Sequence, residues 1–193
     1  DTVACTAGSA TLTFTVPTGA VAGTSYLRLR IGTTAAESQK ITGVVPLGEV
    51  EDYQITIAQP APTLTVAKVS NGGAGPFQFT ATGATIAADT VTTTTAGAAV
   101  SSTTLHVGTA GTAITVSETV PTGWRATSAT CTDANSAITG VTNPINGTLA
   151  GFPVAAGGTA SVTVPGANVK AGANITCTFT NQKLAKLTIV KTA

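Results

Sequence analysis

The sequence predicts an all-β chain with two tandem β-sandwich domains, the first of them incomplete, followed by an orphan C-terminal strand. Only 9% of the 193 residues are charged, and methionine is absent. Threonine and valine, which favour strands, are abundant. Apolar and polar residues alternate in many short runs separated by glycine and proline, with no sustained helical period. Finally, residues 187–193 nearly copy the alternating run at residues 64–70.

The first domain is predicted over residues 1–58. Its first strand places Leu12, Phe14 and Val16 on one inward face, because side chains alternate along a strand. Three strands are too few for a closed sandwich, so we expect the back half of a domain. The predicted strands span 11–16, 26–31 and 48–57, with a loop at 32–43.

Three runs in this region carry a family resemblance. They are Thr-Phe-Thr-Val-Pro, then Tyr-Leu-Arg-Leu-Arg, and then Gly-Glu-Val-Glu-Asp-Tyr before a short strand. Residues 9–57 thereby resemble the GEVED domain of large bacterial surface proteins. The resemblance implies a β-rich extracellular domain, here a partial GEVED-like β-sandwich that lacks the family's N-terminal strands.

Glu49, Glu51 and Asp52 form the densest acidic cluster. Hard cations such as calcium bind carboxylate oxygens, so a calcium site is one interpretation. The other is cross-strand pairing with Arg28 and Arg30. We favour pairing, because neighbouring carboxylates on a strand point to opposite faces and no Asp-x-Asp loop accompanies them.

Residues 59–62 contain two prolines and are predicted to form a stiff linker. Many short strands between turn signals then predict a second β-sandwich over residues 63–183. A further linker and an apolar strand occupy residues 184–193. The strands expected in the second domain are 64–70, 77–80, 90–95, 100–107, 113–120, 124–131, 159–164 and 174–181.

Three strands of this domain carry a polar residue in phase with their apolar side chains. Lys68 follows two apolar residues of the first strand, Glu118 two of a middle strand, and Asn181 three of the last strand. A buried lysine or glutamate without a partner is costly. The three side chains must therefore meet if the sheets close.

This pattern over residues 63–183 resembles the prealbumin-like CnaB or SpaA-type domains of bacterial pili and adhesins. The glutamate precedes a Pro-Thr-Gly-Trp turn, as in that family. The resemblance implies that the Lys68 amine attacks the Asn181 amide and expels ammonia, assisted by Glu118, to form an isopeptide bond between the sheets. Burial favours this chemistry, since it lowers a lysine pKa and raises a glutamate pKa. An ordinary buried ion pair, capped by the asparagine, is the alternative.

The three cysteines lack metal-ligand spacing, and an extracellular disulfide is the better interpretation. We predict a disulfide between Cys131 and Cys177, which would staple the domain in a similar way; two buried thiols are the alternative. Cys5 has no partner left in this sequence. It is expected either to pair with a cysteine outside this sequence or to remain a free thiol. His106 has no catalytic partner in the sequence, so no enzyme is expected. The basic residues are scattered rather than gathered in a patch, which argues against nucleic acid as a partner, and no run is long and apolar enough to span a membrane.

The repeated strand suggests how the protein works. Leu187, Ile189 and Lys191 share one face, and a lone apolar strand needs a sheet to join. We expect the chain to end on the opening strand of a further domain. The favoured function is a subunit of a bacterial surface filament that donates this strand to neighbouring copies, head to tail. The alternatives are a stalk segment of a long, repetitive surface adhesin, and a calcium- or glycan-binding module.

Overall fold

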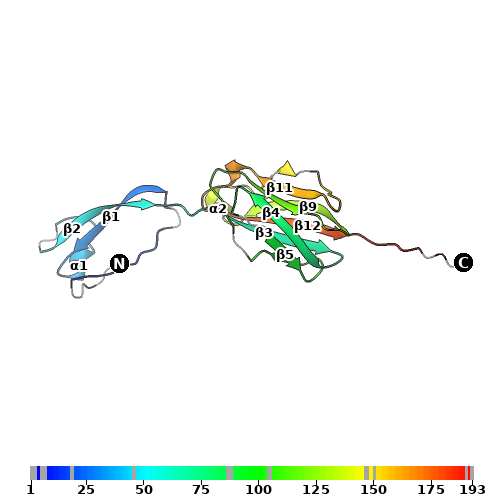
Figure 1. Ribbon diagram of the computed structural model, residues 1–193. Coiled ribbons are helices and arrows are strands. Elements are labelled where there is room, and N and C mark those ends of the chain that lie inside the picture. The colour runs from blue at the N-terminus through cyan, green and yellow to red at the C-terminus, as the bar shows by residue number, and fades with distance from the viewer. Residues whose placement is uncertain are drawn as a thin grey trace. The chain divides into compact units, whose positions relative to one another are not determined.

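The computed structural model describes residues 4, 8–17, 20–44, 47–85, 89–103, 106–145, 148–149, 151–189 and 191 (Figure 1). The chain divides into two compact units, Asp1–Gln59 and Pro60–Ala193. Each unit is described by itself below.

The first unit contains a two-stranded antiparallel sheet, formed by β1 (Gly23–Ile31) and β2 (Glu49–Ile57). The register places Leu27 opposite Tyr53 and Arg28 opposite Asp52. Leucines therefore lie on one face of the ribbon and arginines on the other, as the alternation predicts. A short helix, α1 (Ala35–Ser38), lies within the segment predicted to be a loop, and a capping box closes its N-terminus.

The predicted strand at residues 11–16 is wrong. Residues 10–17 have no regular secondary structure. Leu12, Phe14 and Val16 keep 42%, 53% and 49% of their surface exposed. Alternation alone does not make a strand: an extended segment needs a neighbour to pair with, and among the described residues the sheet of this unit contains only β1 and β2.

The second unit is a β-sandwich of two five-stranded sheets. One sheet has the order β10-β11-β8-β4-β5; the other has the order β6-β3-β12-β9, with β7 also paired to β3. The strand expected at 100–107 is split into β6 and β7. The elements are β3 (Thr63–Asn71), β4 (Gly75–Thr82), β5 (Asp89–Thr93), β6 (Ala99–Ser101), β7 (His106–Val107), β8 (Ile114–Thr119), β9 (Trp124–Asp133), α2 (Ser136–Thr139), β10 (Thr148–Leu149), β11 (Thr159–Val164), η1 (Gly166–Asn168) and β12 (Asn174–Lys183).

The first and last strands of this unit are neighbours. β3 and β12 pair in parallel, from Thr63 opposite Asn174 to Asn71 opposite Gln182. Every other strand pair that the structure describes is antiparallel. Because the two strands run the same way, the start of β3 and the end of β12 lie at opposite ends of the sheet.

The core of the second unit lies between its sheets. Aromatic side chains meet edge to face, with ring centroids 5.2 Å apart for Phe79 and Phe179 and 5.0 Å apart for Phe77 and Trp124. Each fully buried Leu, Ile or Phe contributes about 1.5–3 kcal/mol by the hydrophobic effect. The inward positions of the three patterned strands are all fully buried: Leu64, Val66, Ile114, Val116, Ile175, Cys177 and Phe179.

Part of the predicted proline linker forms backbone hydrogen bonds with the second unit. The carbonyl of Pro60 accepts a hydrogen bond from the amide of Gly172 at 2.7 Å. The carbonyl of Pro62 accepts one from the amide of Gly108 at 2.9 Å. Residues 60–62 therefore lead directly into β3.

Candidate cross-linking site

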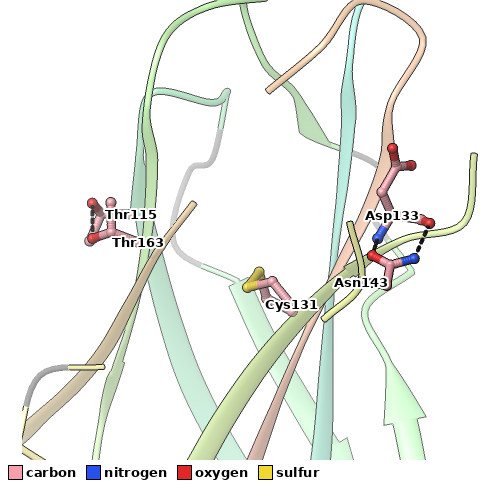
Figure 2. Close-up of a disulfide and its surroundings, with 6 residues drawn as sticks. Thr115, Cys131, Asp133, Asn143 and Thr163 are labelled. Atoms are coloured by element: carbon pink, nitrogen blue, oxygen red, sulfur yellow. Dashed lines mark hydrogen bonds between the residues drawn. A yellow bond between two sulfur atoms is a disulfide. The ribbon is translucent and has the colours of Figure 1, made fainter. Parts of the chain in front are cut away.

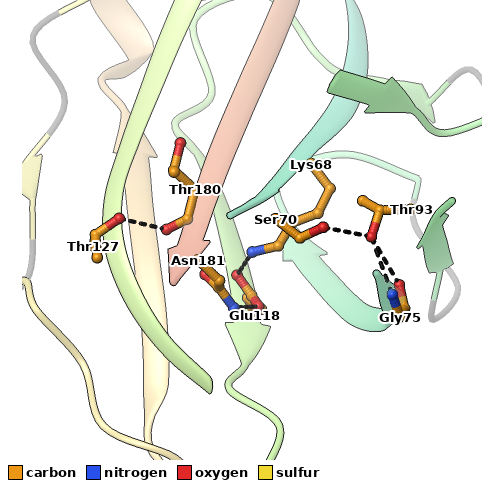
Figure 3. A network of polar contacts seen from close by, with 8 residues as sticks. All are labelled: Lys68, Ser70, Gly75, Thr93, Glu118, Thr127, Thr180 and Asn181. Atoms are coloured by element: carbon orange, nitrogen blue, oxygen red, sulfur yellow. Dashed lines mark hydrogen bonds and ion pairs between the residues drawn. The ribbon is translucent and has the colours of Figure 1, made fainter. Parts of the chain in front are cut away.

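Lys68, Glu118 and Asn181 meet in the core of the second unit (Figure 3). They come from β3, β8 and β12, and each is fully buried. Their place follows from the two-residue period of a strand, which keeps each of them in phase with the apolar residues of its own strand. The sequence predicts this encounter.

The carboxylate of Glu118 lies between the other two groups. Lys68 Nζ donates to Glu118 Oε2 at 2.7 Å, and Asn181 Nδ2 donates to Glu118 Oε1 at 2.5 Å. The other amide atom, Asn181 Oδ1, is buried and has no hydrogen-bond partner among the described residues. Such an orphaned acceptor is unusual in a core and calls for an explanation.

Burial shifts the protonation of the pair toward the neutral forms. Desolvation lowers the pKa of Lys68 to about 8, although the charge and hydrogen bond of Glu118 oppose this shift. Desolvation also raises the pKa of Glu118, against the opposing effects of Lys68 and Asn181. The ring of Phe77 lies 4.4 Å from Lys68 Nζ and helps to exclude water. Transfer of one proton gives a neutral amine, which is a nucleophile, and a carboxylic acid beside an amide.

The expectation that a Lys68–Asn181 bond would join the two sheets is wrong. Both residues belong to one sheet, on the neighbouring strands β3 and β12. Asn181 lies opposite Ser70, two residues beyond Lys68 on β3. Only Glu118 comes from the facing sheet. A bond between Lys68 and Asn181 would instead tie the first strand of the unit to its last.

Cys131 and Cys177 form a disulfide (Figure 2). They lie opposite each other on the antiparallel strands β9 and β12, and both are fully buried. The disulfide therefore joins two strands of the same sheet. It links neither the two sheets nor β3 to β12, so it does not replace the bond considered above. Cys5 lies outside the described residues.

Two buried polar networks beside these residues are not apparent from the sequence. Ser70 Oγ, on the same strand as Lys68, lies 2.6 Å from Thr93 Oγ1 of β5 (Figure 3). The Asp133 carboxylate, fully buried at the end of β9, accepts a hydrogen bond from the Thr139 hydroxyl at 2.6 Å and one from the amide of Asn174 at 2.8 Å. Both networks join distant segments, which a local pattern does not reveal.

Two acidic residues of the first unit, Glu51 and Asp52, form hydrogen bonds with other residues of the β1–β2 ribbon. Asp52 accepts two hydrogen bonds of 2.7 Å from Arg28, which lower the pKa of its carboxyl group. Glu51 accepts a hydrogen bond from the Tyr53 hydroxyl. Arg30, the second expected partner, donates to the Gly43 carbonyl at 3.1 Å. In the described part of the chain, no three His, Cys, Asp or Glu residues gather as metal ligands would, Glu49 included.

His106 is buried between a carbonyl and a carboxylate. Its Nδ1 lies 2.9 Å from the Thr85 carbonyl oxygen, and its Nε2 lies 3.2 Å from Asp89 Oδ2. These contacts join Thr85 and the first residue of β5 to β7. They account for the histidine as a structural residue.

Residues 184–189, which follow β12, are exposed. Just beyond β12, the Leu184 amide donates a hydrogen bond to the Gly123 carbonyl at 2.8 Å. Residues 184–189 have no regular secondary structure, and Leu187 and Ile189 expose 84% and 85% of their surface. Lys191 is exposed as well. Among the helices that the structure describes, none is long and apolar enough to cross a membrane.

Comparison with known proteins places both units in families. Residues 1–56 match the GEVED domain, and residues 64–183 match the prealbumin-like fold domain. No curated protein is significantly similar in sequence.

Three solved structures are similar to parts of the chain. The chain is 18% identical to a bacterial adhesin from Mobiluncus mulieris that contains intramolecular disulfide, isopeptide and ester cross-links, over 68% of this chain and 44% of that one, with a TM-score of 0.39. It is 20% identical to the pilus adhesin SpaC from Lactobacillus rhamnosus, over 69% of this chain and 16% of that one, with a TM-score of 0.32. It is 14% identical to the N168A mutant of the major pilin from Streptococcus pyogenes, over 89% of this chain and 66% of that one, with a TM-score of 0.33.

The chain thus spans less than half the length of the two adhesins. The prealbumin-like match covers 120 residues (64 through 183), which is more than half of the 193 in the sequence. Its strands form the sandwich described above. The chain belongs to the family of prealbumin-like fold domains, and residues 1–56, which precede that fold, match the GEVED domain.

Proposed function

We propose that this protein is a structural, non-enzymatic part of a bacterial surface filament or adhesin, and that its second unit is locked by an isopeptide bond between Lys68 and Asn181. The buried cluster of lysine, glutamate and asparagine carries the proposal. A lysine that served only as a counter-ion would not account for the orphaned Asn181 Oδ1. Family membership and the buried disulfide support an extracellular location.

The reaction balances without a co-reactant. The Lys68 proton passes to Glu118, and the neutral Nζ attacks Asn181 Cγ. Rotation of the amide about its Cβ–Cγ bond lets the protonated Glu118 donate to Oδ1 and polarise the carbonyl. The new Nζ–Cγ bond forms as the Cγ–Nδ2 bond breaks. Nδ2 takes up one proton from Glu118 and leaves as ammonia, while the second proton that Nζ loses passes to Glu118, which stays protonated.

Intact mass spectrometry of the purified chain tests this proposal. The parent chain is expected to weigh one ammonia less than its sequence, after allowance for the disulfide. Lys68→Met removes the nucleophile and should restore the full mass. Lys183→Met, an exposed lysine at the end of β12, is the matched control and should retain the loss. A parent chain of full mass contradicts the cross-link.

We further propose that residues 187–191 join a sheet in a neighbouring copy, so that the copies assemble head to tail. The exposed apolar side chains of Leu187 and Ile189 support this role. Their replacement by aspartate should abolish assembly, measured by analytical ultracentrifugation and electron microscopy. Thr188→Asp, which changes the other face of the same strand, should impair assembly less. A parent chain that stays monomeric at high concentration contradicts strand donation.

The second candidate is a stalk segment of a long surface protein. A specific observation favours it: the Leu-Thr-Ile-Val-Lys run at 187–191 repeats the Leu-Thr-Val-Ala-Lys run of β3, in which Lys68 is the buried residue. In a stalk, this run would be the opening strand of the next repeat within the same chain. Mass spectrometry of the mature protein from the cell surface distinguishes the candidates, because a stalk continues into further repeats.

A further inference from the structure

A β-bulge lies directly beside Asn181. Along β12 and β9 the register runs regularly to Thr180 opposite Ser128, and then shifts so that Asn181 lies opposite Ala126. Thr127 is left as an extra residue on β9. Bulges of this kind bend a strand and re-aim its side chains, and they are frequent next to functional sites.

The bulge decides which side chains of β9 face the core. Upstream of it Trp124 and Ala126 point inward, with 7% and 0% of their surface exposed, while Arg125 is exposed. In an uninterrupted strand, the alternation of the buried residues Ala129, Cys131 and Asp133 would continue toward the N-terminal end of β9. Thr127 and Arg125 would then point inward instead. The smallest inward residue of this stretch, Ala126, thereby lies opposite Asn181 and leaves room for its side chain.

The shift in phase at the bulge also affects the surroundings of Lys68. The inward-facing Trp124 packs edge to face against Phe77, with ring centroids 5.0 Å apart. Phe77 in turn lies 4.4 Å from Lys68 Nζ. The bulge therefore orders the surroundings of both reacting groups.

The bulge is fixed by a hydrogen bond of its own extra residue. The half-buried Thr127 hydroxyl donates to the carbonyl of Thr180 at 3.0 Å (Figure 3). That carbonyl belongs to the peptide group that joins Thr180 to Asn181. The bond therefore holds the backbone from which the reacting amide projects.

We propose that the bulge at Thr127 is a positioning device for the cross-link, with Thr127 as its positioning residue. The inference rests on the proposed Lys68–Asn181 bond. Thr127 does not touch the reacting atoms; it acts through the backbone of Asn181.

The rate of cross-linking tests this role. The chain is synthesised in a cell-free system, and the ammonia loss is followed by intact mass over time, under conditions in which every variant is fully folded. Thr127→Val keeps the shape of the side chain but removes the donor. It should slow the reaction about tenfold, since misplacement of a reacting group is costly in rate. Thr127→Ser keeps the donor and should restore the parent rate.

Thr130→Val is the matched control, because Thr130 is an exposed threonine on the same strand. It should react at the parent rate. The rate of Thr127→Val should also keep the parent's dependence on pH, since Thr127 transfers no proton. A Thr127→Val chain that reacts as fast as the parent, or a Thr127→Ser chain that stays slow, overturns the positioning role alone. A parent chain that loses no ammonia overturns both this inference and the cross-link.

Discussion

The double variant Lys68→Met/Glu118→Gln separates a covalent cross-link from a buried ion pair. It removes both charges together and retains side chains of similar volume. Replacing a buried ion pair by neutral residues is often neutral or stabilising, whereas removing one partner leaves a costly uncompensated charge. If the pair is only ionic, the variant should therefore be about as stable as the parent. If the parent is cross-linked, the variant should be far less stable.

The magnitude follows from the length of chain that the bond would close. Lys68 and Asn181 are 113 residues apart (181 − 68). In the chain-entropy treatment of cross-links, a loop of this length corresponds to about 5 kcal/mol. The second unit comprises 134 residues (60 through 193). At about 4 °C per kcal/mol for a domain of this size, the variant should melt about 20 °C below the parent.

Differential scanning calorimetry of the parent and the double variant provides the measurement, with the disulfide intact in both. Lys183→Met/Glu49→Gln, which changes two exposed charges, controls for the loss of charge itself. Equal melting temperatures for the parent and the core variant would refute the reasoning, whatever the mass of the parent.

Three other predictions concern separate parts of the molecule. In an uncross-linked Asn181→Ala chain, the free energy of unfolding should rise with pH between about 8 and 10.5. Burial lowers the pKa of Lys68 to about 8, so the unfolded chain binds more protons than the folded chain in this window. Urea titrations across this range provide the measurement, and a free energy that falls with pH would contradict the shift. Replacing Cys131 and Cys177 by alanine in that background should remove about 4 kcal/mol, as estimated for a separation of 46 residues; an unchanged urea midpoint would show that the disulfide contributes little. Calcium should leave the melting temperature of the parent unchanged, because an arginine already occupies the Asp52 carboxylate; a rise that chelator reverses, and that Asp52→Asn abolishes, would restore the calcium interpretation.

The two-residue period of strands made the core and the candidate site predictable. It assigned Lys68, Glu118 and Asn181 to inward positions, and the structure buries all three. It did not show that Lys68 and Asn181 belong to one sheet, since the pairing of the first strand with the last depends on the path of the whole chain. Alternation likewise predicted a strand at 11–16 that has no partner in the described sheet.

The bulge on β9 left a trace in the sequence. Trp124 and Cys131 are the inward residues most readily recognised on this strand, and they are separated by an odd number of positions. In an uninterrupted strand, two residues seven apart point to opposite faces. An extra residue between them is therefore required if both are to be buried. The position of that residue was not predictable, because the intervening side chains are all small or polar.

The parallel pairing of β3 with β12 has a mechanical consequence. Tension applied through the linker pulls β3 back from Thr63, while tension on the following segment pulls β12 forward from Lys183, in the opposite direction. The two strands are thus loaded in shear, and the nine paired positions between them must yield together rather than unzip one at a time. With Lys68 joined to Asn181, the applied force would pass through the new bond and not through residues 69–180. A pulled sandwich would then stay folded until a covalent bond breaks.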